Sequence, residues 1–402
     1  MLDLPRSARA TAIRRPLSMA LLICLACAGS VTGAATPKPG HPGETCEASL
    51  ERKDAKRSAT VCSQEVAALR ASKNPNGESL AMAYERLGLA QFQLRQFADA
   101  ESSFRSAYAT RVKHQGKDHP SLATTLTRIS ESLMLQNKAM AAEPLLLRAL
   151  TLRETASGQI SAEAAAARHA LGMLYSRENR LPQAEQHFRQ EIAILDRLPA
   201  PNLAERAIAS NNLGYVLQRS GKSDEARACY RTAVELLDKA GPAEESQQID
   251  PLLNLSVLAS EGGRHAEAEQ WLLRLLAIRD KHNGIDSAES ADVHNRLGVL
   301  YALANDAAKA EASMLKALQL REKHFGSHHL LVAEAAGNLG LLRMRQGKLN
   351  EALPLLRHSA AVTQVLAGAQ SELAKSRWIN LEKLYSAIIQ QQIQQQIQQQ
   401  KK

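Results

Sequence analysis

The chain has 402 residues, of which 45% are hydrophobic and only 3% aromatic, and its formal net charge is +9 at pH 7. This length holds two or three ordinary domains or one extended array of repeats. The hydrophobic fraction is dominated by Ala and Leu rather than by the aromatic and β-branched residues of β-sandwiches, so the composition argues against a β-sandwich and predicts an all-α fold.

Residues 1–35 have the pattern of a secretory signal peptide. Four arginines precede or border a short apolar run, PLSMALLICLACAGSVTGAA, which ends in small residues. A basic start, a short apolar stretch and a small-residue exit are typical of such signals. We expect cleavage after Ala35 and a periplasmic or secreted protein. Two alternatives remain open: an uncleaved membrane anchor, although the run is shorter than the ~20 residues of a spanning helix, and a lipoprotein modified at Cys27.

Residues 36–43, TPKPGHPG, form a proline-containing linker. Removing residues 1–35 takes away four Arg and one Asp, which lowers the formal charge from +9 to +6. No Lys/Arg block with interleaved aromatics marks a nucleic-acid surface, so we expect no nucleic-acid partner. The remaining cysteines are Cys46, Cys62 and Cys229, and in an oxidising compartment we expect one disulfide and one buried thiol.

A period of 42 residues runs through residues 79–372. Steps of 42 meet an aliphatic residue each time, at Leu87, Ile129, Leu171, Leu213, Leu255, Leu297, Leu339 and Leu381. Ala follows thirteen residues later, at Ala100, Ala142, Ala184, Ala226, Ala268, Ala310 and Ala352. Four residues further on stands a large side chain, at Phe104, Leu146, Phe188, Tyr230, Leu272, Met314 and Leu356. Seven registers without an insertion indicate seven copies of one structural unit.

Each period contains two helical patterns. In the first, Leu is followed by Gly, or by Ser in the second and fifth copies, and the missing side chain lets a neighbouring helix approach closely. In the second, Ala and the large residue share one face at i, i+4 spacing. The corner between them is Gly or Asn in six copies of seven, residues that tolerate the left-handed conformation ending a helix. This series is Arg95, Asn137, Asn179, Gly221, Gly263, Asn305 and Gly347.

A second corner is expected where the second helix of each copy ends. It recurs at Gly116, Gly158, Ala200, Pro242, Gly284, Gly326 and Gly368. The first series also explains Gly221-Lys222-Ser223, which looks like part of a phosphate-binding loop. A Walker-type loop has a further Gly where this chain has Val216, and it follows a strand. We therefore interpret Gly221 as a corner between helices.

The Leu-Gly, Ala and Phe/Tyr signature over paired helices resembles the tetratricopeptide repeat. The 42-residue period, with phrases such as NNLGYVLQRSGKSDEARACY and GKDHPSLATTL, resembles the kinesin-light-chain form of that repeat. The resemblance covers residues 79–372 as seven repeats and implies a right-handed α-solenoid of paired antiparallel helices. Departures from the pattern, such as Glu191 and Leu275 where Ala is usual, are expected to loosen the packing locally.

Capping elements are expected at both ends of the array. Counting back one period places Cys46 at the phase of Gly88 and Cys62 at the phase of Phe104, which lie on adjacent helices of a repeat. We expect residues 44–78 to be a degenerate capping helical hairpin with a Cys46–Cys62 disulfide; two unrelated thiols are the alternative. Residues 373–389 are expected to form a closing helix. Residues 390–402 are a Gln-rich tail, for which a frayed segment is favoured; the alternatives are that Ile389, Ile393 and Ile397, at i+4 spacing, extend a helix or self-associate.

No catalytic motif stands out in the chain. It contains no Gly-x-Ser-x-Gly elbow and no His-Glu-x-x-His. His324, His328 and His329 in HFGSHH are a weak metal candidate, and a structural role at a loop corner is favoured. We expect no enzymatic activity, no cofactor, no metal site and no small-molecule substrate.

The expected ligand surface is the face of each first helix opposite its periodic Leu. At 100° per residue, the positions one before, five before and six after Leu fall together on the concave side. The position before Leu is Arg or Asn in seven cases of eight. Asn amides pair with both the N–H and C=O groups of an extended peptide, and Arg grips carboxylates. The alternative is that the Asn side chains bond adjacent helices and the Arg side chains are solvated.

In similar repeat proteins, Asn at this phase contacts the backbone of a bound peptide, which implies the same for Asn212, Asn254 and Asn338. The candidate peptide-binding residues are Arg86, Arg128, Arg177, Asn212, Arg219, Asn254, Arg296 and Asn338. The first half of the groove has no acid at the flanking positions, whereas the second half contains Asp250, Glu261, Asp292 and Glu334, so the first half should favour an acidic segment.

These features predict an exported, non-catalytic scaffold that binds a protein or peptide in its groove. The alternative is a structural assembly protein of an envelope complex that uses its tail and convex faces. Membrane contact is expected only if the signal segment is retained.

Overall fold

The computed structural model describes residues 45–51, 54–72 and 76–400, and within these ranges the regular elements are all helices. The fold is all-α, as predicted. None of the described helices combines the length and the apolar character of a membrane span. The predicted signal segment and linker lie outside the described residues.

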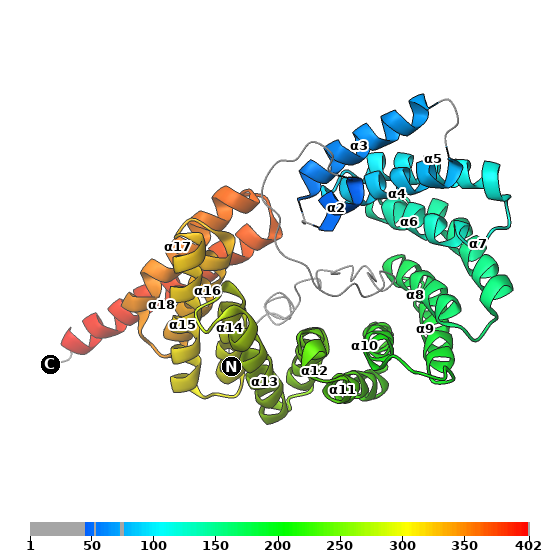
Figure 1. Ribbon diagram of the computed structural model, residues 1–402. Coiled ribbons are helices and arrows are strands. Elements are labelled where there is room, and N and C mark those ends of the chain that lie inside the picture. The colour runs from blue at the N-terminus through cyan, green and yellow to red at the C-terminus, as the bar shows by residue number, and fades with distance from the viewer. Residues whose placement is uncertain (1–44, 52–53, 73–75, 401–402) are drawn as a thin grey trace. The chain divides into compact units, whose positions relative to one another are not determined.

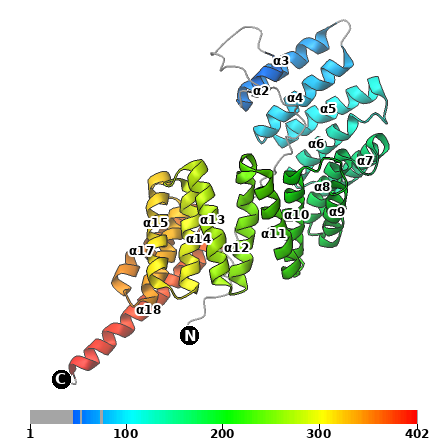
Figure 2. The same cartoon turned by 60° about the horizontal axis from the view of Figure 1, so that its bottom comes forward.

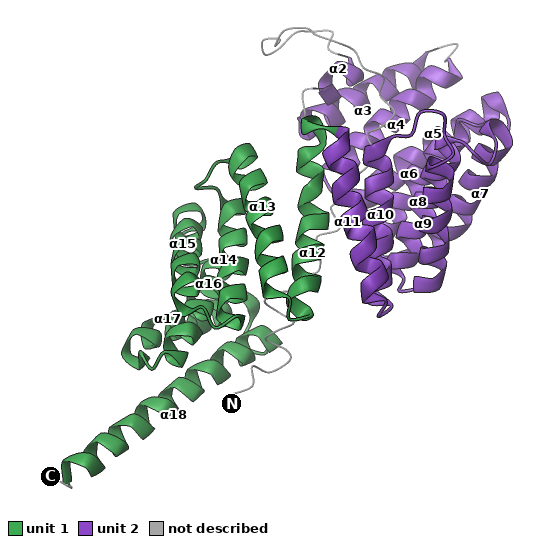
Figure 3. Cartoon of the chain, turned by 90° about the horizontal axis from the view of Figure 1, so that it is seen from below, with its two compact units in different colours: residues 1–25, 241–402 green, residues 26–240 purple. Residues whose placement is uncertain are grey.

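The chain divides into two compact units at Gly241 (Figure 3). The described helices of the N-terminal unit are α2 (Cys46–Glu51), α3 (Ala55–Ala71), α4 (Gly77–Gln93), α5 (Phe97–Gln115), α6 (Leu122–Leu135), α7 (Ala139–Ser157), α8 (Ala162–Arg177), α9 (Leu181–Leu195), α10 (Leu203–Arg219) and α11 (Ser223–Ala240). Those of the C-terminal unit are the 3₁₀ helix η1 (Pro242–Gln248), α12 (Ile249–Glu261), α13 (His265–Asn283), α14 (Ala288–Leu303), α15 (Ala307–Phe325), α16 (Leu330–Arg345), α17 (Leu349–Ala367) and α18 (Glu372–Gln400).

The helices from α4 to α17 form the seven pairs that the period predicts. In the N-terminal unit, α4, α6, α8 and α10 make one layer and α5, α7, α9 and α11 the other (Figures 1 and 2). The short helix α2 and the longer α3 precede them as a hairpin packed on α4. The C-terminal unit has three such pairs, followed by α18, which packs on α17.

The periodic small residues are the points of closest helix approach. All seven periodic alanines, from Ala100 to Ala352, have no exposed surface. A Cβ atom added at Gly88 would lie 2.6 Å from the Phe104 ring, and one at Gly172 would lie 2.6 Å from the Phe188 ring. Where Ser replaces Gly in the second repeat, the Ser130 hydroxyl is buried and donates to the Leu126 carbonyl at 2.8 Å. The Leu-Gly signature is therefore a packing requirement within each helix pair.

The corners between paired helices adopt the predicted left-handed conformation in all seven repeats. Their φ angles run from 59° at Asn179 to 79° at Gly221, and the non-glycine Arg95 has 61°. The second corner series needs two corrections. In the fourth repeat the left-handed residue is Gly241, with φ of 99°, because the ring of Pro242 excludes positive φ and instead begins η1. In the third repeat α9 ends at Leu195, and Ala200 has no positive φ.

The C-terminal end differs from the expected closing helix and frayed tail. One uninterrupted helix, α18, covers both segments and runs through Ile389, Ile393 and Ile397 to Gln400. Its first part contributes Leu381 and Leu384 to a buried cluster with Leu349, Ala352 and Leu356. Gln is a good helix former, so nothing in the local sequence ends the helix at residue 389.

Candidate peptide-binding surface

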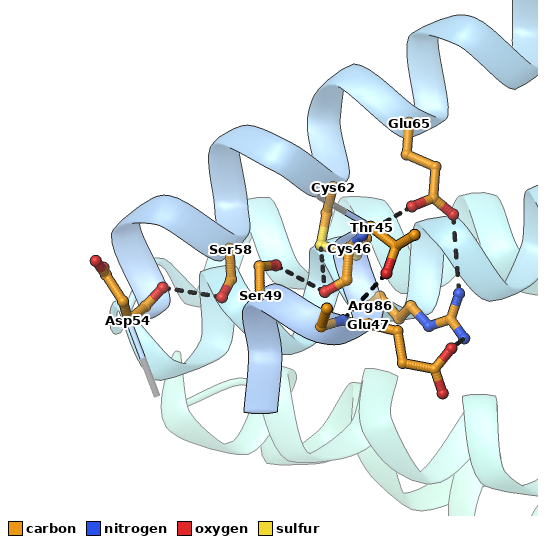
Figure 4. The surroundings of a disulfide bond; sticks show 10 residues. Thr45, Cys46, Glu47, Ser49, Asp54, Ser58, Cys62, Glu65 and Arg86 are labelled. Atoms are coloured by element: carbon orange, nitrogen blue, oxygen red, sulfur yellow. Dashed lines mark hydrogen bonds and ion pairs between the residues drawn. A yellow bond between two sulfur atoms is a disulfide. The ribbon is translucent and has the colours of Figure 1, made fainter. Parts of the chain in front are cut away.

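The predicted N-terminal disulfide is present, and two acids near it pair with one candidate arginine. Cys46 and Cys62 are joined with their Cα atoms 4.6 Å apart, and both are fully buried (Figure 4). Glu47 and Glu65 flank the bridge: the Arg86 guanidinium lies 2.6 Å from Glu47 Oε2 and 3.8 Å from Glu65 Oε1. Arg86 therefore connects the first repeat to the hairpin.

Two further candidate arginines also have carboxylate partners on their own helices. Arg128 on α6 lies 3.1 Å from Glu131, and Arg296 on α14 donates to Asp292 at 2.9 Å. Arg296 also borders a small pocket of about 30 Å³, which has room for about one water molecule. The charges of Arg128 and Arg296 are thus compensated within the fold.

Arg177 and Arg219 have a different environment. Each is the last residue of its helix and reaches back one repeat to a corner asparagine. Arg177 Nη2 donates to Asn137 Oδ1 at 2.9 Å, and Arg219 Nη2 donates to Asn179 Oδ1 at 2.8 Å. Arg219 also donates to a backbone carbonyl of α8 at 3.1 Å and lies 5.6 Å from the Tyr215 ring centroid. Among the residues that the structure describes, the hydrogen-bond partners of both arginines are neutral, so their positive charges remain at the surface.

The three candidate asparagines occupy three kinds of position. Asn212 on α10 is half-buried. Asn254 on α12 is only 5% exposed, so its amide is not offered to a ligand in this structure. Asn338 on α16 donates to Asn295 Oδ1 of α14 at 3.0 Å, and Asn295 is itself buried. Asn338 therefore joins α16 to α14, the first helices of adjacent repeats, as the alternative interpretation of the asparagine series described.

The acids expected in the second half of the groove include counter-ions of a buried arginine that sequence reasoning missed. Arg321 on α15 is 1% exposed; it donates to the Leu331 carbonyl at 2.9 Å and lies 3.3 Å from Asp292 and 3.4 Å from Glu334. Five periods earlier, Arg111 on α5 is buried in the same way against Glu85 and Glu78. Recurrence of Arg at this phase of the period was the signal that could have identified both.

A series of ion pairs that was not predicted from the sequence links consecutive repeats. The residue after the periodic Ala is Glu in five repeats, and three of these acids lie in the N-terminal unit. Glu143 accepts from Arg180 of the next repeat at 2.6 Å, and Glu185 lies 2.9 Å from Lys222. The hydrogen bond from Arg180 lowers the pKa of Glu143 despite the opposing effect of partial burial. These pairs hold neighbouring repeats in register.

The remaining candidate groups have structural roles. His329 caps α16 by accepting from the Leu331 amide at 3.1 Å, and the His324 ring contacts the Asp286 carbonyl. No cluster of three or more metal-ligating side chains occurs in the described part of the chain. The Cys229 thiol is half-buried, and burial raises its pKa, which disfavours the reactive thiolate.

Matches to known families agree with this architecture. Models described as tetratricopeptide repeat match residues 80–121, 165–190, 205–281 and 289–364. No curated protein is similar enough in sequence to match the chain.

Solved structures share the fold at low sequence identity. The apo form of RapI has a TM-score of 0.58 and 15% identity over 77% of this chain and 87% of that chain. The apo form of the quorum sensor NprR from B. thuringiensis has a TM-score of 0.55 and 12% identity over 79% and 85%. BtubC (BKLC) from P. vanneervenii has a TM-score of 0.50 and 20% identity over 59% and 94%. With its seven helix pairs at a 42-residue period, the chain belongs to the tetratricopeptide repeat family.

Proposed function

We propose that the N-terminal unit binds an acidic segment of a protein partner along α8 and α10, and that the chain is an exported, non-catalytic scaffold. The observation that carries the proposal is the contrast among the candidate arginines. Arg86, Arg128 and Arg296 have carboxylate partners, whereas the hydrogen-bond partners of Arg177 and Arg219 are neutral. An arginine whose charge is not compensated within the fold is the better ligand for an incoming carboxylate.

Two stripes of side chains lead along the helices to these arginines. The residues are spaced by four, three and four, which keeps each stripe on one helix face. The α8 stripe consists of Ala166, Ala170, Met173 and Arg177, and the α10 stripe consists of Ile208, Asn212, Tyr215 and Arg219. All eight side chains are partly or fully exposed.

This arrangement fits an extended peptide. The Asn212 amide can pair with its backbone, the apolar residues can contact a neutral side chain, and the two guanidinium groups can receive its carboxylates. The family and fold support a binding role: one structure of this fold belongs to a quorum sensor. The signal-like residues 1–35 support a partner met in the periplasm or outside the cell.

The test is charge reversal in the full chain. The variant Arg177→Glu/Arg219→Glu is compared with Lys113→Glu/Lys239→Glu, which makes the same change of net charge at exposed positions of α5 and α11. The probes are immobilised peptides rich in Asp and Glu and their Asn/Gln counterparts, at low and high salt. Arg177→Gln/Arg219→Gln keeps an amide donor for the corner asparagines and separates the loss of charge from structural disturbance.

We expect the wild type and the lysine control to prefer the acidic peptides and to lose that preference as salt rises. In the glutamate variant, the preference for acidic over Asn/Gln peptides should be about tenfold smaller than in the wild type. Each exposed ion pair is worth roughly 0.2–1 kcal/mol, and charge reversal adds repulsion. Its salt dependence should be flat. An equal preference for acidic peptides in the wild type and the glutamate variant would refute the assignment of the binding site to α8 and α10.

A further inference from the structure

Beyond Ile388, α18 has no packing partner among the described residues of its own unit. Every side chain from Ile389 to Gln400 is exposed, and the helix projects past the other helices of its unit (Figures 1 and 3). An isolated helical segment of this length is marginal in water, even for good helix formers. Side-chain contacts from another helix are the usual source of the missing stability.

One face of α18 carries an exposed apolar stripe. Its members are Trp378, Tyr385, Ile389, Ile393 and Ile397, whose exposed fractions run from 39% to 55%. At 100° per residue they fall within about a third of the helix circumference, whereas the buried Leu381 and Leu384, which pack with residues of α17, lie outside this sector. The stripe therefore lies on a face that the core of the unit does not use.

We propose that this stripe pairs with the same stripe of a second copy of the chain, as an antiparallel helix pair centred on Ile389. In this register Tyr385 faces Ile393 of the other copy, and Ile389 faces its own symmetry mate. Glu382, the charged residue in the middle of the stripe, faces Gln396, whose amide can donate to the carboxylate. A two-fold interface requires such a self-complementary surface, and residues 382–396 supply it around one centre.

The distribution of charge along α18 favours antiparallel over parallel pairing, and pairing over membrane binding. Parallel pairing in register would place Glu382 against Glu382 and Lys383 beside Lys383, whereas antiparallel pairing places these residues against the uncharged segment 390–400. Helices that lie on membranes carry Lys and Arg along the polar face. Residues 384–400 carry no charge at all, so no Lys or Arg lines the polar face along this part of the helix.

The contact area is sufficient for a reversible dimer. Side chains of these sizes leave roughly 80–100 Å² each at the observed exposure, or about 900 Å² of apolar surface for two stripes. The stems of the intervening glutamines bring the total to about the 1,000 Å² at which specific interfaces begin. The pairing is independent of peptide binding on α8 and α10.

The test is the mass of the full chain in solution as a function of concentration. The variant Ile389→Glu/Ile393→Glu is compared with Gln391→Glu/Gln395→Glu, which adds the same charge at the same spacing on the opposite side of the same exposed helix. We expect a concentration-dependent dimer for the wild type and the glutamine control, and a monomer for the isoleucine variant. A wild type that stays monomeric, or a glutamine control that dissociates equally, would overturn the proposal.

Cysteine cross-linking tests the direction, in a Cys229→Ser background. Antiparallel pairing predicts that Ile389→Cys cross-links to itself and that a mixture of Tyr385→Cys and Ile393→Cys chains forms mixed dimers. Self-cross-linking of Tyr385→Cys without the mixed product would refute the register. Binding of the monomer to vesicles of mixed neutral and anionic lipid, lost in Ile389→Glu/Ile393→Glu, would assign the stripe to a membrane instead.

Discussion

Removing the Cys46–Cys62 disulfide should release α2 from the N-terminal hairpin and leave α3 and the repeats folded. The bridge joins residues 16 apart in sequence, and closing a loop of this length restricts the unfolded chain by about 3 kcal/mol. The helix α2 has six residues, far fewer than the ~12–15 at which an isolated helix becomes marginal. The other contacts of α2 include a hydrogen bond from the Cys46 amide to Glu65 at 3.0 Å and the Glu47–Arg86 ion pair.

The ion pair cannot replace the bridge. The Glu47 side chain is 67% exposed, and pairs of this kind contribute about 1 kcal/mol or less. The bridge is therefore the largest single contribution to the placement of α2. Without it, we expect α2 to detach and the Arg86 guanidinium to lose its Glu47 partner, while α3 keeps its packing against α4.

Hydrogen exchange on the Cys46→Ser/Cys62→Ser variant measures this directly, with Cys229→Ser as the matched control for loss of a thiol. A loss of 3 kcal/mol corresponds to about a hundredfold faster exchange of the α2 amides. The amides of α6 to α11 should be unaffected, because repeats interact mainly with their neighbours. Reduction of the wild type should reproduce the effect. Unchanged α2 protection in the double variant would show that the ion pair and the packing, and not the bridge, hold the hairpin.

Three further predictions concern stability. Gly88→Ala places a methyl group 2.6 Å from the Phe104 ring and should lower the free energy of unfolding in urea by about 1–3 kcal/mol. Adding Phe104→Leu should restore part of this loss. An unchanged free energy in Gly88→Ala would contradict the packing role of the Leu-Gly pair. Asn338→Ala should lower the free energy of unfolding by about 1–3 kcal/mol, because it leaves the buried Asn295 amide without this partner. Asn212→Ala should be nearly neutral. Thermal unfolding that ranks the two variants in the reverse order would refute this assignment. Burial alone would lower the pKa of His169, but the charge of Glu191, 3.0 Å away, raises it. The folded state therefore holds this proton more tightly than the unfolded state, so stability should fall as pH rises from about 6.5 through the folded pKa, and Glu191→Gln should remove this part of the slope in urea titrations.

The repeat architecture could be predicted from sequence because it depends on local requirements that recur at a fixed spacing. A left-handed corner selects Gly or Asn, and close helix approach selects Gly and Ala, so each copy repeats the same residues. The same logic placed the disulfide, since Cys46 and Cys62 occupy the phases at which Gly88 and Phe104 touch. It failed at Pro242, where the neighbouring Gly241 takes the corner, and at the tail, where the low-complexity composition favoured a frayed segment although Gln sustains a helix.

Tertiary structure decided which candidate side chains keep their charge or their polar groups at the surface. Arg128 and Arg177 look alike in sequence, but the first lies beside Glu131 and the second reaches Asn137, 40 residues away. Asn212 and Asn254 share one phase, yet Asn254 is buried and Asn212 only half-buried. Periodicity determines the direction of a side chain from its own helix, whereas its partners and exposure depend on the residues that the adjacent repeats bring against it.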